Sequence, residues 1–316
     1  MKVLVTGASG FIGRNVLLAL PRDWRIVATC HRDESFPEFL RERSLEHVTP
    51  VRVDLADGPS AGTALQAFKA FDACVYLAAN GDPAYSARAP AQDLRANALA
   101  LLNVLAAAKF GHFLFFSSGA VYDGLQGMVD PESAVRPTLP YAISKWASER
   151  YVLHAKSQGG VESASIVRFF GAYGPYEPAR KIYGRLVRQF AFAKKPEFSI
   201  RGDGRNLIDA MYVDDAVRGI QSILANARDT RTFDFYSGAP LTLKDLVAGT
   251  AREFGLEAQI EYLGEVPEYI EFRSRDRTMQ TEFGFKPAVA LSEGLRRFET
   301  WMSQEEKSCQ TLKSAP

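Results

Sequence analysis

The first residues with recognisable chemistry are the glycines of a loop near the start of the chain, Gly7, Gly10 and Gly13. The loop follows a β-forming run, Val3–Val5, and leads into a helical pattern. A pyrophosphate bound at a helix N-terminus requires this layout, because the glycines permit a tight turn, close approach of backbone N–H groups and close helix–strand packing. The G-x-x-G-x-x-G spacing therefore predicts dinucleotide binding, although it differs from the commoner G-x-G-x-x-G fingerprint. Ordinary turn glycines are the alternative.

A second group of reactive side chains lies near the middle of the chain: Ser118, Tyr141 and Lys145. Tyr141 and Lys145 are four residues apart in a predicted helix and share one face. A nearby ammonium group stabilises a phenolate, so we expect it to lower the pKa of Tyr141 and make the phenol a usable acid/base. Ser118 ends a predicted buried strand, and its hydroxyl could bond the substrate oxygen that Tyr141 protonates. A chance pair on a helix and a strand-capping serine are the alternative.

These side chains require a scaffold, and the first half of the chain predicts one in which strands and helices alternate. Continuous apolar strands separated by helices indicate a doubly wound parallel sheet, a Rossmann-type α/β fold. Ligands of such sheets bind beyond the carboxyl ends of the strands. The predicted strands are Val3–Thr6, Arg25–Cys30, Val48–Asp54, Asp72–Ala79, Gly111–Ser118 and Ala164–Phe170. The predicted helices are Phe11–Leu20, Ser60–Ala70, Ala91–Lys109 and Tyr141–Ala155.

The pattern changes after about residue 172, where turn signals become frequent. We expect a Rossmann domain at 1–171, a smaller mixed α/β substrate-binding domain mainly at 172–302, and some later elements that return to the first domain. Residues 303–316 are polar and unpatterned, which predicts a flexible tail. The predicted elements are helices at Tyr183–Ala193, Val213–Ala225 and Leu243–Phe254, and strands at Glu197–Ile200, Thr232–Tyr236 and Gln259–Leu263.

Composition excludes several classes of function. The 316 residues carry a net charge of +1 and are 47% hydrophobic, which gives no sign of a nucleic-acid partner. The three cysteines have neither pairing nor metal-ligand spacing, so we expect reduced thiols in the cytoplasm and no metal site. The longest apolar stretch, Ala98–Ala108, is too short to span a membrane, and the N-terminal strand leaves no room for a signal peptide.

In their order along the chain, the motifs resemble those of the extended short-chain dehydrogenase/reductases, the NAD(P)-dependent epimerase/dehydratase superfamily. The resemblance covers roughly residues 1–300. It implies that Tyr141 is the catalytic acid/base, that Lys145 holds the nicotinamide ribose and tunes Tyr141, and that Ser118 orients the substrate carbonyl or hydroxyl. The matching segments are Thr6–Gly13, Asp54-Leu55, Leu77–Ala79, Asn97, Phe116–Tyr122, Tyr141–Lys145, Arg168–Phe170, Tyr173–Pro175 and Tyr212–Asp215.

The resemblance also implies a set of cofactor contacts. Asp54 would bond the adenine amino group, and Ala78 and Ala79 would line the cofactor. Asn97 belongs to the set, with bracing of the active-site strand as its alternative role. The remaining members are Gly7, Ser9, Gly10, Phe11, Ile12, Gly13, Leu55, Leu77 and Phe170, together with Tyr141 and Lys145.

One departure from the family pattern concerns the cofactor. NAD-using relatives end the second strand with an acidic residue that bonds the ribose hydroxyls. Here the strand ends Cys30-His31-Arg32, with no carboxylate before Asp33. A guanidinium can bond a 2′-phosphate bidentately, so Arg32 and His31 favour NADP over NAD. The alternative is that Arg32 is a solvated charge and that Asp33 binds the ribose of NAD.

Further departures concern the substrate. Ile208 stands where nucleotide-sugar relatives carry the arginine that grips the diphosphate, and Gly171 where they carry asparagine. Gly119 and Ala120 replace the Asp-Glu pair that dehydratases use, so we expect no dehydration. The candidate substrate residues are Ser118, Gly171, Tyr173, Arg180, Arg205 and Arg273, with Lys181 as a further available cation.

Together these features predict an enzyme that moves a hydride between NADP(H) or NAD(H) and a sugar carbon. We expect a ketoreductase or an epimerase of a nucleotide-linked sugar, and a homodimer is one expected assembly. The alternatives are a dehydrogenase of a free sugar or another small alcohol, and an NADP-binding sensor without turnover. The presence of Ser118, Tyr141 and Lys145 together argues against the sensor.

Overall fold

The computed structural model describes residues 1–265 and 270–313, with side chains as far as residue 307. The chain forms two compact units, each built from three segments. Unit 1 contains Met1–Phe170, Val217–Phe235 and Phe272–Lys286. Unit 2 contains Gly171–Ala216, Tyr236–Glu271 and the chain from Pro287 onward.

A seven-stranded parallel sheet forms the centre of unit 1, in the order β12-β7-β5-β4-β1-β2-β3. Its strands are β1 (Lys2–Thr6), β2 (Arg25–Cys30), β3 (Val48–Arg52), β4 (Ala70–Tyr76), β5 (Lys109–Ser118), β7 (Val161–Phe169) and β12 (Arg231–Phe235). From β1 the chain builds outward first on one side and then on the other. This order confirms the predicted doubly wound fold and locates the binding edge at the carboxyl ends of β1 and β4.

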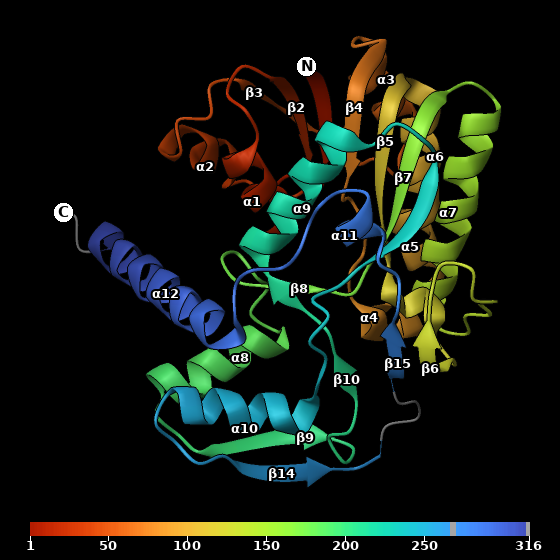
Figure 1. The fold of residues 1–316 in the computed structure, drawn as a ribbon. Helices are drawn as coiled ribbons and strands as arrows, with labels where there is room; N and C mark the ends of the chain where they lie inside the picture. The colour runs from red at the N-terminus through yellow and green to blue at the C-terminus, as the bar shows by residue number, and fades with distance from the viewer. Residues whose placement is uncertain (266–269, 314–316) are drawn as a thin grey trace. The chain divides into compact units, whose positions relative to one another are not determined.

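Helices cover both faces of this sheet (Figure 1). On one face lie α3 (Gly58–Gln66), α6 (Ala100–Ala107) and α7 (Pro140–Ser157), whose buried side chains pack with β5 residues in one apolar core. On the other face lie α1 (Phe11–Ala19) and the unit 1 part of α9 (Val213–Asn226). The Gln221 side chain of α9 donates to the Ala19 carbonyl of α1 at 2.6 Å.

The remaining elements of unit 1 are short. They are α2 (Phe36–Glu42), α4 (Pro83–Arg88), α5 (Pro90–Leu94), the π-helical turn η1 (Arg95–Leu99), the 3-10 turn η2 (Gly119–Tyr122), β6 (Gln126–Val129) and α11 (Thr278–Thr281). Strand β15 (Glu271–Ser274), which begins in unit 2, pairs with β6.

The predicted helix Ala91–Lys109 is wrong in detail. The segment divides into α5, η1 and α6, and the backbone is extended at Ala108, so that Lys109 begins β5. The π turn surrounds the buried Asn97, whose side chain is hydrogen-bonded within the protein. The apolar pattern could not reveal this interruption, because the cause is a polar side chain.

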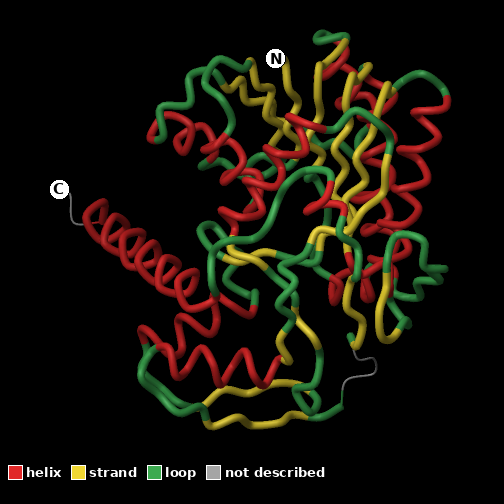
Figure 2. The backbone as a smooth tube through the Cα atoms, viewed as in Figure 1, coloured by secondary structure: helices red, strands yellow, loops and turns green. Residues whose placement is uncertain are grey.

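Unit 2 is built on a parallel two-stranded ribbon of β9 (Glu197–Arg201) and β14 (Gln259–Leu263), with α10 (Leu243–Glu253) beside it (Figure 2). Phe190, Phe198 and Leu246 are in its buried core. Its other elements are β8 (Ala172–Tyr173), α8 (Ile182–Val187), η3 (Arg188–Phe192), β10 (Leu207–Ile208), β11 (Met211–Tyr212), β13 (Leu241–Thr242) and α12 (Leu291–Lys313). Strand β8 pairs with β11, and β10 pairs with β13.

The segment 303–316, predicted as a flexible tail, is helical as far as Lys313, because α12 continues to that residue. Straight-chain charged residues such as Glu305, Glu306 and Lys307 are good helix formers, even without a repeating apolar face. The rest of that prediction, residues 314–316, lies outside the described residues. Among the described helices, none combines the length and the apolar character needed to cross a membrane.

Candidate active site

The glycine loop between β1 and α1 is packed too tightly for larger residues. Gly7 has φ +63°, and a Cβ there would lie 2.9 Å from the Ala78 backbone nitrogen. A Cβ on Gly13 would lie 2.4 Å from the Gly7 carbonyl oxygen. Gly10 precedes α1 and offers no side-chain cap. The helix N-terminus, left without a side-chain cap, fits a dinucleotide diphosphate. Of the predicted residues, Ser9 lies in the loop, and Phe11 and Ile12 begin α1.

The carboxyl end of β4 is tied to the same loop. The Thr6 hydroxyl accepts hydrogen bonds from the Leu77 and Ala78 N–H groups, both at 3.1 Å. These contacts hold the Leu77–Ala79 segment beside the glycine loop, as the cofactor prediction requires. Leu55 differs, because its side chain lies in the apolar core and leaves only backbone for a ligand.

Ser118, Tyr141 and Lys145 come together in unit 1. Ser118 ends β5, and its hydroxyl accepts from the Ala120 N–H at 3.1 Å. The same hydroxyl is near enough to the Tyr141 phenol to lower its pKa. Tyr141 and Lys145 lie one turn apart in α7. A substrate oxygen placed at Ser118 and Tyr141 would therefore meet two hydroxyl groups, one of which can exchange a proton.

Burial sets the pKa values of this group. It raises the pKa of Tyr141, an effect that Asp93 strengthens and the hydrogen bond from Ser118 partly offsets. The expected lowering of the Tyr141 pKa is thus wrong for the protein alone, because desolvation of the phenolate outweighs its favourable contacts. Burial also lowers the pKa of Lys145 to about 8, against the opposing charges of Glu149 and Asp93. The Lys145 ammonium donates to the Phe116 carbonyl.

A buried carboxylate, Asp93 of α5, holds the helix beneath Tyr141. Its Oδ1 accepts from Asn80 Nδ2 at 2.8 Å, Ser86 Oγ at 2.6 Å and Asn97 Nδ2 at 3.0 Å. Its Oδ2 accepts from Ser144 Oγ at 2.6 Å. Asn97 Oδ1 accepts from the Asn80 N–H at 2.7 Å, so both ends of its amide bond to protein. These bonds favour the bracing role for Asn97 over direct contact with cofactor.

A second buried carboxylate, Glu149, lies one turn beyond Lys145. Ser117 donates to it at 2.5 Å, and Arg168 of β7 binds it with two parallel bonds of 3.1 and 2.9 Å. The side chains of Glu149 and Arg168 are 0% and 3% exposed, so the pair is shielded from water. Because Ser117 precedes Ser118, this ion pair holds the strand end and the helix together.

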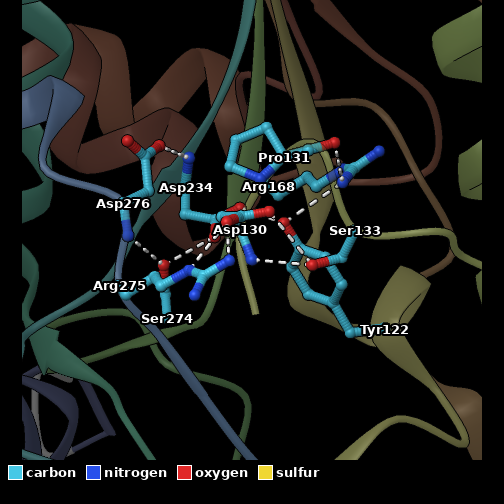
Figure 3. Close-up of polar contacts among 9 residues, drawn as sticks. All are labelled: Tyr122, Asp130, Pro131, Ser133, Arg168, Asp234, Ser274, Arg275 and Asp276. Carbon is cyan, nitrogen blue, oxygen red and sulfur yellow. Dashed lines mark hydrogen bonds and ion pairs between the residues drawn. The ribbon is translucent and has the colours of Figure 1, made fainter. Parts of the chain in front are cut away.

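The network extends beyond Arg168, as Figure 3 shows. Arg168 donates to the Tyr122 hydroxyl at 3.1 Å, and Tyr122 donates to Asp234 at 2.7 Å. Ser274 donates to the other Asp234 oxygen at 2.6 Å. Burial raises the pKa of Asp234 to about 7, although the bonds from Ser274 and Tyr122 oppose this shift. The network therefore joins β7, β12 and β15 through polar side chains inside the unit.

A cavity of about 680 Å³ lies where β2 and β3 end. Its lining includes the predicted residues His31, Arg32 and Asp54, together with Arg52. Asp54 bonds the Ala56 N–H at 2.9 Å and lies 3.5 Å from Arg95. The cavity has room for an adenosine, and three of its side chains are cationic or can become so.

Asp33, the alternative ribose ligand, is already engaged. One carboxylate oxygen pairs with Arg14 at 2.7 Å, and the other accepts from the Ser35 N–H and hydroxyl at 3.0 and 2.7 Å. A ribose hydroxyl would have to compete with these partners.

Unit 2 contains its own cavity of about 240 Å³. Tyr173 and Tyr183, stacked with their ring centroids 4.1 Å apart, line it, and so does Ile208. No lysine or arginine is among its described lining residues. Gly171, with φ +138°, packs against Ala210, another lining residue.

No contact between described residues brings the predicted substrate-binding arginines Arg180, Arg205 and Arg273 together. Arg180 and Arg205 are exposed in unit 2, where Arg205 forms an ion pair with Asp203. Arg273 is exposed on β15 in unit 1, between the buried Phe272 and Ser274. Phe170, a predicted cofactor residue, packs over Gly119.

Comparison with known proteins decides the family. Residues 3–237 match the sequence model described as the NAD dependent epimerase/dehydratase family, which is well over half of the chain. The chain belongs to this family. The resemblance predicted from the motifs is thereby confirmed, and the protein is an enzyme that depends on a nicotinamide dinucleotide.

Relatives of this family member are nucleotide-sugar enzymes by name. A dTDP-glucose 4,6-dehydratase of Streptomyces griseus is 29% identical over 314 residues, covering 95% of this chain and 93% of the relative. UDP-glucuronate 4-epimerase 1 of Arabidopsis thaliana is 27% identical over 334 residues, covering 95% and 76%. The structure of MoeE5 with UDP-glucose and NAD has a TM-score of 0.84 and 27% identity, and the alignment covers 97% of this chain and 100% of that one.

Several residues of this epimerase/dehydratase-family site were missed from the sequence. Asp93, Glu149 and Arg52 were not predicted as site residues. A signal for Glu149 was present, because it lies four and eight residues after Lys145 and Tyr141 on one helical face. Asp93 also lies four residues before its partner Asn97, a spacing that places both on one helical face. Arg52 gave no such signal, since its partners His31 and Glu34 lie 21 and 18 residues away.

Proposed function

We propose that this protein is a nucleotide-sugar epimerase that oxidises one hydroxyl-bearing ring carbon and reduces it again from the opposite face. The observation that carries the proposal is the Ser118–Tyr141 hydroxyl pair beside the buried ammonium of Lys145. The relatives named above support a nucleotide sugar as substrate.

In this proposal the side chains of the site handle the proton. Tyr141 takes the hydroxyl proton during oxidation and returns it during reduction, while Ser118 keeps the same oxygen in place. The Lys145 ammonium stabilises the Tyr141 phenolate and bonds the ribose of the cofactor. A nicotinamide dinucleotide held by its diphosphate at the glycine loop would supply the hydride acceptor and donor.

Dehydration is not part of the proposal. Gly119 and Ala120 stand where dehydratases carry an Asp-Glu pair. A Cβ at Gly119 would lie 3.1 Å from the Phe170 ring, so an aspartate there would require a small shift of that ring. The chain therefore lacks, at these two positions, the acid that starts elimination.

The test is to incubate the enzyme with UDP-glucose, UDP-glucuronic acid and dTDP-glucose and to follow the sugar ring by proton NMR. An epimerase produces an inverted ring carbon with no net change in cofactor absorbance. A keto sugar formed or consumed in step with the cofactor would replace epimerase by ketoreductase. Conversion of free sugars alone would contradict the nucleotide-sugar proposal.

We also propose NADP as the preferred cofactor. His31, Arg32 and Arg52 line the adenosine cavity, and Asp33 is engaged by Arg14 and Ser35. A 2′-phosphate in this cavity would find cationic partners, whereas a ribose without phosphate would find no unengaged carboxylate from Asp33.

For the substrate diphosphate we propose Arg180, Arg205 or Arg273 as the anchor, since Ile208 cannot serve. Alanine variants of the three should separate the cases: the anchoring variant raises KM strongly, because a phosphate loses a charge-assisted partner. No effect in any of the three would contradict a diphosphate held by these residues.

We further propose a homodimer formed through α7. Ile143, Trp146 and Tyr151 are exposed along this helix, and Leu94 and Leu99 are exposed on α5 and η1, which pack against α7. Exposed apolar side chains on helices that pack together favour association. Light scattering should show a dimer that Trp146→Glu converts to monomer; a wild-type monomer would contradict the proposal.

A further inference from the structure

The N-terminus of α7, which carries Tyr141, is held from outside the helix. The residue before the helix is Leu139, which offers no side-chain cap. Asp123 Oδ2 instead accepts three hydrogen bonds: from the Thr138 N–H at 2.9 Å, the Thr138 hydroxyl at 2.8 Å and the Leu139 N–H at 3.0 Å. A carboxylate at this end of a helix is also favoured by the helix dipole. Asp123 therefore fixes where α7 begins.

The other end of this connection leads to Ser118. Ser118 and Asp123 flank the 3-10 turn η2. The Ser118 hydroxyl accepts from the Ala120 N–H, and the Asp123 N–H donates to the Ala120 carbonyl at 2.9 Å. Val121 and Tyr122 within the turn are fully buried. Ser118 and Asp123 thus belong to one short, packed segment.

We propose that Asp123 is a positioning residue that sets the spacing between Ser118 and Tyr141. Tyr141 is the second residue of α7, so a movement of the Thr138–Leu139 segment is passed directly to the phenol. Other bonds reach α7 further along the helix: the Asp93 cluster binds it at Ser144, and Ser117 binds it at Glu149. The bonds to Asp123 reach the segment just before Tyr141. The inference rests on the proposed function in that Ser118 and Tyr141 share one substrate oxygen.

The kinetic test compares three variants. Asp123→Ala removes all three acceptor bonds and should lower kcat by about 10-fold to 100-fold, the range for a misplaced reacting group, with KM changed less than about 3-fold. Asp123→Asn keeps an oxygen acceptor and should retain most of kcat. Asp130→Ala is the matched control, since Asp130 holds a nearby loop through Ser133 and Arg275 and should leave kcat unchanged.

A readout without substrate separates this inference from the proposed function. In protein labelled at tyrosine ¹³Cζ, the Tyr141 signal is assigned by its loss in Tyr141→Phe. Asp123→Ala should move that signal as Ser118→Ala does, whereas Asp123→Asn and Asp130→Ala should not. If Asp123→Ala does not fold, Thr138→Val, which removes one of the three bonds, should move it in the same direction by less.

Different results would contradict the role of Asp123 and the proposed function. A Tyr141 signal unchanged in Asp123→Ala, or moved equally in the asparagine variant, would overturn the positioning role, as would an equal loss of kcat in Asp130→Ala. Inactivity of the wild type on every nucleotide sugar would instead overturn the proposed function, and the NMR comparison would still decide the role of Asp123.

Discussion

Arg168 and Arg32 both lie near the carboxyl edge of the large sheet, at the ends of β7 and β2, but one is buried and the other is exposed. The Arg168 side chain is 3% exposed and bound on both sides, by Glu149 and by the Tyr122 hydroxyl. Arg32 is exposed and lines the cavity at the ends of β2 and β3. A buried guanidinium with all its partners in the protein organises the fold, whereas an exposed one beside a cavity is available to a ligand. Residue type alone does not separate the two roles; burial and partners do.

The largest expected effect is the loss of protein stability on replacing the buried arginine, Arg168. Arg168→Leu leaves the Glu149 carboxylate buried without its partner, so we expect a loss of about 3–5 kcal/mol in the free energy of unfolding. Arg32→Ala should change it by less than about 0.5 kcal/mol, as is usual for exposed positions. Chemical denaturation of both variants measures the difference.

The double variant Glu149→Met with Arg168→Leu sharpens the same test. Removing both charges takes away the unpaired carboxylate, so the double variant should recover much of the lost stability. A double variant as unstable as the sum of the two single ones would show that the arginine contributes by packing rather than by pairing.

Tyr141→Phe tests whether Tyr141 is the acid/base of the reaction. The variant keeps the ring but loses the exchangeable proton, so turnover should fall at least ~100-fold, as for loss of a general acid–base. Cofactor affinity should stay close to wild type in a fluorescence titration. Near-normal turnover would remove Tyr141 from the mechanism.

Arg32→Ala tests whether the exposed arginine binds the 2′-phosphate of NADP. It should weaken NADPH by ~1.5–3 kcal/mol, the range for a charge-assisted bond, and leave NADH nearly unchanged. Isothermal titration of wild type and variant with both cofactors provides the measurement. Wild-type protein that binds NADH as tightly as NADPH would return the enzyme to the NAD group.

The smallest effect is a pH dependence that only a buried cation should show. The folded-state pKa of Lys145 is lowered to about 8, below its ordinary value of 10.5, so the folded protein binds fewer protons than the unfolded chain between these values. The free energy of unfolding must then rise as the pH increases from 8 to 10.5. Below pH 8 the full cost of burying the charged Lys145 ammonium is present. Relative to Lys145→Met, the cofactor-free wild type should gain roughly 1–2 kcal/mol between pH 8 and 10. Parallel curves would mean that Lys145 is more solvated than its burial indicates.

Much of the fold could be predicted from the sequence, because apolar strands and glycine turns are local signals. The bounds predicted for Arg25–Cys30 and Gln259–Leu263 match β2 and β14. The helix start at Phe11 was predicted from the glycine loop and is observed. The tail and the interrupted helix were not predicted, since one depends on helix propensity without periodicity and the other on a buried amide.

The site was less accessible to sequence reasoning. Ser118, Tyr141 and Lys145 were named from spacing, and the structure places them together. The carboxylates that hold them bond residues far away in the chain. Asp93 accepts from Ser144, 51 residues away, and Glu149 accepts from Arg168 and Ser117, 19 and 32 residues away. Such pairings depend on the folded topology, and so does the desolvation that raises the Tyr141 pKa.

The alternation of the chain between its two units has a consequence for synthesis. Each unit is assembled from three separate segments, so neither can be released by cutting the chain once. Strand β12, which covers the edge of β7, is made more than sixty residues after β7 ends, and Ser274 follows later still. During synthesis, the backbone groups on one edge of β7 therefore remain unpaired until β12 emerges from the ribosome, and they can pair with other chains. The growing chain is most exposed to aggregation in that interval, and a chaperone that shields β7 would protect it.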